Sequence, residues 1–206
     1  RVYFTTHGPL GSDLTGTNAG ALTQVPLAGG ALVVAYHLAN STPTPLGDQA
    51  QLVLDGPTLA RVWSGAVVRW NDSAISALNP YLAANGLLPD ADITLYYSDD
   101  VRGSLSDLFL GYVCSHATNP TACQAGGFAG LVPSGRSFES AQRAADVKAM
   151  PNSLTFLGLA EANAAQLSVA AMLANGTTTK VQPTTTSITS AMTDATAQFN
   201  SLAAAN

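Results

Sequence analysis

Cys114, His116 and Cys123 lie close together in the segment CSHATNPTAC. Thiolate and imidazole groups bind zinc, but a structural zinc site needs a fourth ligand, and the usual short spacing between the cysteines is absent. The turn-forming pair Asn119-Pro120 between the cysteines favours a loop that brings the two sulfur atoms together. We therefore predict a disulfide between Cys114 and Cys123 and no metal site. The alternative is a pair of free thiols, as in a cytosolic protein.

The sequence carries no recognisable catalytic motif. The patterns GxSxG, HExxH and the P-loop do not occur. His7 and His37 have no carboxylate or cysteine partner at a catalytic or metal-ligating spacing, so we interpret both as structural or exposed. Trp63 and Trp70 are expected in the core rather than in a ligand site. We expect the protein not to be an enzyme and to use no cofactor.

The composition excludes several classes of partner. The chain has 206 residues, of which 47% are hydrophobic and 10% charged, and its net charge is −5. With only eight Lys and Arg there is no basic surface to neutralise a nucleic acid backbone. The mean hydropathy of +0.19 argues against disorder. The apolar run Leu27–Leu38 is interrupted by glycines and falls short of a membrane span, so we expect no such span.

Three asparagines match the glycosylation pattern: Asn40, Asn71 and Asn175. Ser and Thr are frequent enough in this chain for chance matches to be expected, so occupancy stays open. Scarce lysine, abundant Ala and Thr and the predicted disulfide together favour a secreted protein, extracellular or periplasmic.

Strands and helices alternate along the predicted chain. A buried strand is expected over Gly29–Tyr36, whose nearly continuous apolar character suits a sheet covered on both faces. A helix is expected from about Asp55 or Thr58, because Pro57 suits a first-turn position. The other expected elements are a strand at 2–4, a helix capped by Asp72 and ended by Asn79-Pro80, a strand over 93–97, a helix over 105–113, a helix over 137–150, a strand over 154–157 and an Ala-rich helix over 159–173. This alternation predicts an α/β fold.

A series of short motifs in the middle of the chain is more specific than this alternation. The motifs are Leu54-Asp55-Gly56, Thr58-Leu59-Ala60, Val62-Trp63-Ser64-Gly65, Trp70-Asn71-Asp72, Leu78-Asn79-Pro80 and Leu88-Pro89. In this order and spacing the series closely resembles the phosphate-binding protein of bacterial phosphate ABC transporters. The resemblance extends upstream through Val25–Ala35 and downstream through Pro151–Leu154 to Val181–Thr184. It covers about Val2–Ala191.

The resemblance implies a fold and a domain organisation. Such proteins have two α/β lobes with the ligand in the cleft between them. Residues 1–32 resemble a remnant of the first lobe that leads into the hinge strand, and residues 33–206 resemble the second lobe. The expected fold is thus a periplasmic-binding-protein-like lobe with a mixed or largely parallel sheet flanked by helices. The missing first lobe, or other protein domains, are the expected partners.

The resemblance also indicates where a small anion would bind. The family uses an arginine after a strand, then a Ser-Gly-Thr turn at a helix N-terminus, which cradles the anion. Here Tyr97 replaces the arginine, Ser98 matches, and Arg102-Gly103-Ser104 can serve as the turn if the loop is shifted. A family carboxylate near the N-terminus has no counterpart at its matching position.

Arg136 is a second candidate cation, because it lies in a Ser-Gly-Arg-Ser segment where the family has a glycine-rich turn near the cleft. The alternative is an N-cap at Ser137 with a solvated arginine. The tentative ligand-binding residues are therefore Ser98, Arg102, Gly103, Ser104 and Arg136.

Two functions remain. The absence of the family's arginine and carboxylate favours an extracellular phosphate-binding-protein-like domain whose ligand site is degenerate, acting as a structural or protein-interaction module. The alternative is a solute-binding module for phosphate or another small anion.

Overall fold

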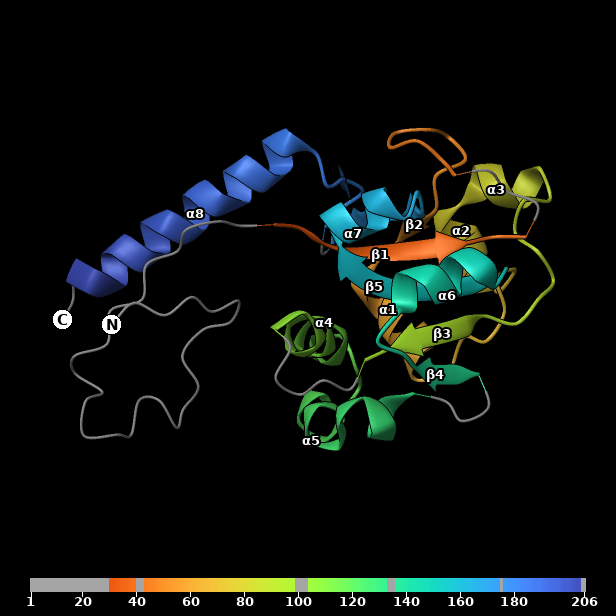
Figure 1. Ribbon diagram of the computed structural model, residues 1–206, viewed down its shortest axis with the longest axis horizontal. Coiled ribbons are helices and arrows are strands. Elements are labelled where there is room, and N and C mark those ends of the chain that lie inside the picture. The colour runs from red at the N-terminus through yellow and green to blue at the C-terminus, as the bar shows by residue number, and fades with distance from the viewer. Residues whose placement is uncertain (1–29, 40–42, 99–103, 133–135, 175, 205–206) are drawn as a thin grey trace.

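A mixed five-stranded sheet organises the computed structural model (Figure 1), which describes residues 30–39, 43–98, 104–132, 136–174 and 176–204. The strand expected at 2–4 and nearly all of the expected first-lobe remnant lie outside these residues. The strand order is β4-β3-β5-β1-β6. The strands are β1 (Leu32–His37), β3 (Thr94–Tyr97), β4 (Ser137–Glu139), β5 (Ser153–Gly158) and β6 (Ser168–Val169).

Parallel and antiparallel pairs occupy different parts of this sheet. β3 runs parallel to both β4 and β5, whereas β1 pairs antiparallel with β5 and β6. In the β1–β5 pair, Leu32 lies opposite Gly158 and His37 opposite Ser153. A smaller sheet has the order β2-β7-β8, formed by β2 (Val53–Leu54), β7 (Ala171–Leu173) and β8 (Lys180–Val181).

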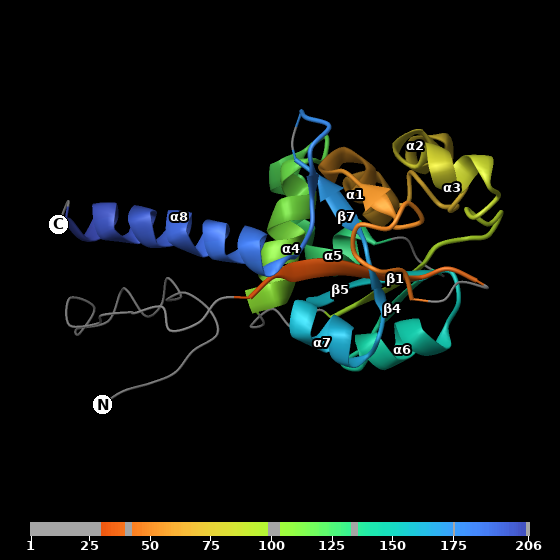
Figure 2. The ribbon, with the colours of Figure 1, turned by 90° about the horizontal axis from the view of Figure 1, so that it is seen from above.

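Helices cover both faces of the five-stranded sheet, as the edge-on view in Figure 2 shows. One face carries α1 (Gly56–Trp63), α4 (Ser104–Ser115) and α5 (Pro120–Leu131). The other face carries α6 (Arg143–Ala149) and α7 (Leu159–Ala164). Further helices are α2 (Ser73–Leu78), α3 (Pro80–Ala84) and α8 (Thr185–Ala204). The predicted α/β fold with a mixed sheet is confirmed.

Local sequence explains how several of these helices begin. The side chain of Asp55 caps α1 by accepting a hydrogen bond from the Thr58 amide at 2.7 Å, with Pro57 in the first turn. The side chain of Asp72 caps α2 in the same way through the Ala74 amide. Both predicted helix starts are confirmed.

The buried amide of Asn79 then fixes the end of α2. It accepts a hydrogen bond from the Val53 amide and donates to the carbonyls of Val53 and Ile75. The asparagine of the LNP motif therefore ties α2 to strand β2.

The core lies on both faces of β1, as its apolar sequence predicts. Val34 and Tyr36 point into a large cluster with the helices of one face, and Val33 and Ala35 point into a smaller cluster on the other. Trp63 and Trp70 are fully buried in the larger cluster, which confirms their predicted core role. Trp63 packs against an aromatic group formed by Phe109, Phe128 and Phe156.

Several predicted elements differ from the structure. The helix expected over 137–150 is instead strand β4 followed by α6, so Ser137 begins a strand and caps no helix. The Ala-rich helix expected over 159–173 ends at Ala164, after which β6 and β7 pair with β1 and β2. Tertiary pairing outweighs the helix propensity of alanine there.

Three helices, α3, α5 and α8, were not predicted. Asn119-Pro120 is the start of α5 rather than an isolated turn, because the Asn119 side chain caps the helix at the Ala122 amide. The predicted disulfide is nevertheless present: Cys114 in α4 is bonded to Cys123 in α5, with their Cα atoms 5.4 Å apart. It joins two helices that cover the same face of the sheet.

Candidate ligand site at the carboxyl ends of the parallel strands

The parallel strands β3, β4 and β5 end at the same edge of the sheet. In α/β sheets this carboxyl edge is where ligands usually bind, because loops and helix N-termini meet there. The arrowheads of β3 and β5 in Figure 1 mark this edge, on the side of the sheet where α4 lies. Ser98 follows the last residue of β3, and Ser104 is the first residue of α4.

The structure thus places two of the predicted ligand residues at one edge. Ser98 is partly buried directly after β3, and the backbone of Ser104 begins the helix that follows. Arg102 and Gly103 lie between them, outside the described residues, so the shifted arrangement of the loop stays a prediction.

Tyr97 takes the position of the family's arginine. Its ring stacks on Phe128 of α5, with ring centroids 5.5 Å apart and an interplanar angle of 29°. The position that the resemblance assigns to an anion-binding cation therefore carries an aromatic ring directed toward the core face of the sheet.

Arg136 lies at the other end of the strands. It precedes the first residue of β4, and its carbonyl accepts a hydrogen bond from the Leu95 amide. Its guanidinium donates to the carbonyls of Val68 and Ile93, at 3.0 and 3.3 Å. The paired strands therefore separate Arg136 from Ser98 instead of bringing the two together.

Arg143 is the arginine that the described structure brings to the carboxyl edge, and sequence reasoning missed it. It is the first residue of α6 and donates to the carbonyls of Phe156 and Ser140, at 3.3 and 3.5 Å. Its guanidinium carbon lies 4.9 Å from the centroid of the Phe156 ring. Burial lowers the pKa of Arg143, and the nearby charge of Glu161 partly opposes that effect.

No sequence signal marks Arg143 as a site residue. The helix expected over 137–150 would place it in mid-helix, and only strand β4 moves the helix start to position 143. Ser140, in the turn between these elements, donates through its hydroxyl to Asp146 and accepts from the Gln142 amide, which fixes the turn. Arg143 is therefore positioned by both the strand pairing and this turn.

Other predicted sites are placed as follows. Asn71 is exposed and its amide nitrogen donates to Asp90, whereas Asn40 and Asn175 lie outside the described residues.

Within the described ranges no group of His, Cys, Asp and Glu is arranged to hold a metal ion. The helices of the described part of the chain include none with the length and apolar character to cross a membrane.

The fold, and the position of the candidate site at the carboxyl ends of β3, β4 and β5, define one α/β lobe of the periplasmic-binding-protein type. A solved structure titled as a possible phosphate binding protein from Planctomyces limnophilus superposes with a TM-score of 0.50. The superposition covers 79% of this chain and 48% of that chain, at 19% identity, so it supports the fold alone.

Sequence comparison gives the more specific result. The phosphate-binding protein PstS 3 of Mycobacterium tuberculosis is 32% identical over 148 residues, which are 71% of this chain and 36% of that protein. The chain is thus similar, in sequence and in fold, to part of the phosphate-binding proteins of bacterial phosphate ABC transporters. No protein-family model matches it.

Two proteins of Acanthamoeba polyphaga mimivirus, each named a serine/threonine-protein kinase/receptor, are also similar. One is 45% identical over 87 residues, which are 42% of this chain and 5% of that protein. The other is 30% identical over 182 residues, which are 84% of this chain and 10% of that protein. The chain therefore spans a small part of both mimivirus relatives.

Proposed function

We propose that this chain is an extracellular domain related to phosphate-binding proteins, with a degenerate ligand site, that acts as a structural or protein-interaction module. The observation that carries this proposal is the ring of Tyr97, which stacks on Phe128 where the family has its arginine. Arg143 reaches the same edge, but two of its nitrogens donate to backbone carbonyls. The proposed role is to interact with another protein domain or to serve as a structural module, and we propose no catalytic activity.

The energetic consequence is large. In the related proteins several charge-assisted contacts converge on one anion, and each contributes about 1.5 to 3 kcal/mol. Without the arginine and the carboxylate, binding is weaker by about 3 to 6 kcal/mol, or two to four orders of magnitude in affinity.

Further observations agree with an exported module of a longer protein. The disulfide between Cys114 and Cys123 suits an oxidising compartment. Asn71 is exposed and available as a glycosylation site. The similarity to 5 and 10% of two receptor-named proteins supports a module embedded in a much longer chain. In this view residues 33–206 form a second-lobe-like domain, and 1–32 lead into it from a first lobe or another domain.

Calorimetric titration of the full chain with inorganic phosphate tests the proposal. We expect binding too weak to measure at submicromolar concentrations. A submicromolar dissociation constant would overturn the degenerate-site proposal and favour transport-type binding.

A solute-binding module for phosphate or another small anion is the second candidate. It is favoured by the position of Ser98 and the start of α4 at one edge, with Arg143 close to the same strand ends. If weak phosphate binding is measured, Arg102→Ala should abolish it under the shifted-loop arrangement, and Arg143→Ala should abolish it if the α6 arginine supplies the cation. Arg136→Ala is the matched control, because its guanidinium lies at the opposite end of the strands.

A further inference from the structure

Strand β1 lacks a neighbouring strand along part of one edge. It pairs with β5 over its full length, Leu32–His37. On its other edge, β6 pairs only with Ala35 and Tyr36, in the second half of the strand. Within the described residues, the first half of that edge therefore has no strand beside it.

The chain turns away from β1 directly after β6. The Ala170 amide still donates to the Val34 carbonyl at 2.9 Å, but the Ala171 amide donates to the Leu52 carbonyl, next to β2. β7 then continues beside β2 in the smaller sheet. This change from one sheet to the other leaves the edge of β1 open at Leu32.

The backbone of Leu32 faces this open edge. Leu32 lies opposite Gly158 in the antiparallel pair, and the Leu159 amide donates to the carbonyl of Ala31. Hydrogen-bonding groups alternate between the two edges of a strand, so those of Ala31 point toward β5 and those of Leu32 point away from it. The Leu32 amide and carbonyl form no hydrogen bond within the described residues. Such unpaired groups are a template for a further strand.

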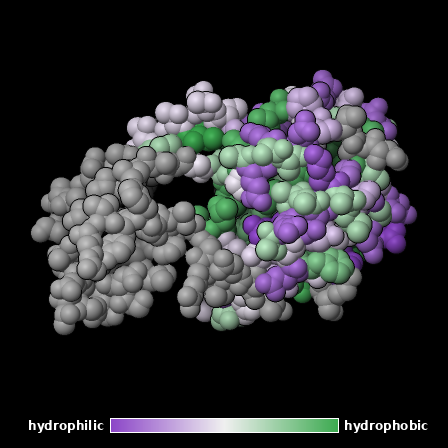
Figure 3. Space-filling view, in the orientation of Figure 1, coloured by the Kyte–Doolittle hydropathy of each residue, from purple (hydrophilic) through white to green (hydrophobic). Residues whose placement is uncertain are grey.

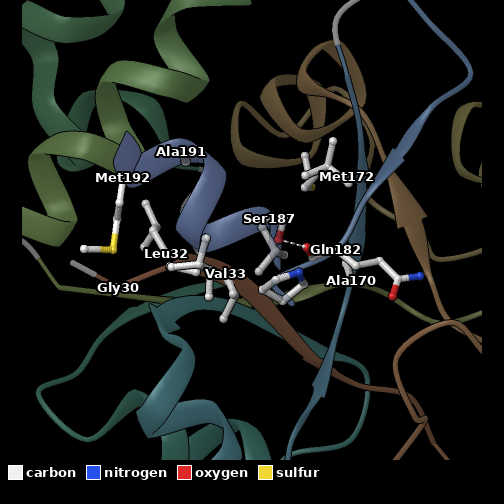
Figure 4. Close-up of a pocket in the computed structure, with 14 residues that line it drawn as sticks. Gly30, Leu32, Val33, Ala170, Met172, Gln182, Ser187, Ala191 and Met192 are labelled. Carbon is white, nitrogen blue, oxygen red and sulfur yellow. Dashed lines mark hydrogen bonds between the residues drawn. The ribbon is translucent and has the colours of Figure 1, made fainter. Parts of the chain in front are cut away.

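An apolar cavity of about 350 Å³ lies along the same edge (Figure 4). Leu32, Met172 and Ala191 line it from β1, β7 and α8. Ligand sites typically have volumes of about 300 to 1,000 Å³ and mostly apolar walls. Figure 3 shows hydrophobic residues at the side of the domain from which α8 departs. Space for apolar side chains therefore lies beside an unpaired strand backbone.

We infer that this edge binds an extended apolar peptide segment of a partner protein, which joins the sheet antiparallel to β1. The inference rests on the proposed role as a protein-interaction module and names the kind of partner. The added segment continues the line of β6, which itself runs antiparallel to β1. One of its residues pairs with the amide and carbonyl of Leu32, and alternate side chains enter the cavity.

The backbone of Leu32 selects a peptide over an apolar small molecule. A hydrocarbon ligand would fill the cavity, but it would take water away from the Leu32 amide and carbonyl without replacing their hydrogen bonds. In an antiparallel pair, two opposing residues exchange both hydrogen bonds, so a single peptide residue satisfies both groups. Specificity then comes from the side chains that enter the cavity.

Calorimetric titration of the full chain with a blocked peptide, acetyl-Val-Thr-Leu-Thr-Val-amide, tests this inference. Its Val and Leu residues share one edge and one face of a strand, and its Thr residues share the other. N-methylation of the Leu nitrogen removes the N–H that donates to the Leu32 carbonyl, so we expect binding about tenfold weaker.

N-methylation of the first Thr nitrogen, on the opposite edge of the peptide, is the matched control. It should change the affinity by less than about twofold, because that N–H points away from β1. No binding at millimolar peptide, or equal effects of the two methyl groups, overturns the strand pairing.

A cavity-filling variant locates the bound peptide. Ala191→Trp places a large side chain at the wall of the cavity and should weaken binding by about tenfold or more. Thr189→Trp is the matched control, because Thr189 is exposed on α8 outside the lining, and it should leave the affinity unchanged. An affinity that Ala191→Trp leaves unchanged would place the peptide elsewhere and overturn the inference.

Sedimentation equilibrium without peptide separates this partner from a second copy of the chain. We expect a monomer at micromolar concentration. A dimer that the peptide dissociates would assign the edge to self-association and overturn the proposed partner. A submicromolar dissociation constant for phosphate would overturn the degenerate-site function even if the peptide binds, so the inference and the proposed function can fail separately.

Discussion

At the scale of single residues, Tyr36 links the two sheets. Its side chain is almost fully buried, and its hydroxyl oxygen accepts a hydrogen bond from the Leu52 amide at 3.0 Å, next to strand β2. Burial raises the pKa of Tyr36, and the hydrogen bond from Leu52 partly opposes this shift. The folded state therefore favours the neutral hydroxyl more strongly than the unfolded chain does.

We predict that Tyr36→Phe destabilises the fold by about 1 to 3 kcal/mol at neutral pH, because the buried Leu52 amide loses its acceptor. Since the folded pKa lies above the unfolded value, this tyrosine's contribution is complete below the unfolded pKa and is lost as pH rises through the folded one. The variant should therefore lose less stability than wild type between neutral pH and about pH 10.5.

Urea unfolding at both pH values measures this effect. Tyr81→Phe is the matched control, because Tyr81 is 45% exposed. Equal alkaline losses in wild type and in Tyr36→Phe would contradict the assignment of the pH dependence to Tyr36.

At the scale of elements, the disulfide between α4 and α5 holds together the helices that carry Phe109 and Phe128. These two rings cover Trp63, so the covalent bond secures one wall of the larger core. Its effect on stability should therefore be visible in the fluorescence of that tryptophan.

We predict that replacing both cysteines by alanine lowers the free energy of unfolding by about 2.5 to 3 kcal/mol, as expected for closing a loop this short. The cysteines are nine positions apart in the sequence. Urea unfolding followed by tryptophan fluorescence checks this. A thiol reductant should shift the wild-type midpoint toward that of the double variant, and should leave the double variant unaffected.

Much of the order of helices and strands was predictable from the sequence, because local signals and tertiary structure agree. Asp55 with Pro57, Asp72, and the apolar run of β1 specify their elements through capping and hydrophobicity alone. Residues 165–173 were not predictable in this way, because their alanines favour a helix while β6 and β7 form only by pairing with distant strands.

The candidate site was predictable in part for the same reason. Ser98 and Ser104 follow from the motif series, since it fixes strand β3 and the helix after it. Arg143 depends on where β4 ends and on the backbone carbonyls of β5, which no local pattern encodes. The placement of Arg136 at the opposite strand ends likewise depends on the register of β4 against β3.

At the scale of the whole molecule, one sheet separates two hydrophobic clusters. Trp63 and Trp70 belong to the larger cluster, and Leu157 lies fully buried in the smaller one. Strand β1 contributes side chains to both, so neither cluster can lose its packing while the other keeps the sheet intact.

We predict that Leu157→Ala destabilises the protein by about 2 to 5 kcal/mol and shifts a single unfolding transition. Tryptophan fluorescence reports on the larger cluster and far-ultraviolet circular dichroism on the whole backbone, and both should move to the same new midpoint. A fluorescence transition that stays at the wild-type midpoint would show that the two faces unfold independently.

The apolar cavity between the start of β1 and the first turns of α8 has a consequence for how this domain could be inserted into a longer protein. Gly30, at the entry to β1, and Met192, in the helix by which the chain leaves, line the same cavity. In the described part of the chain, the segment that leads into β1 and the first half of α8 are therefore neighbours. A domain that is entered and left at adjacent points can be inserted into a surface loop of a host protein without moving the two ends of that loop apart. Such an insertion therefore adds only a small loss of loop-closure entropy.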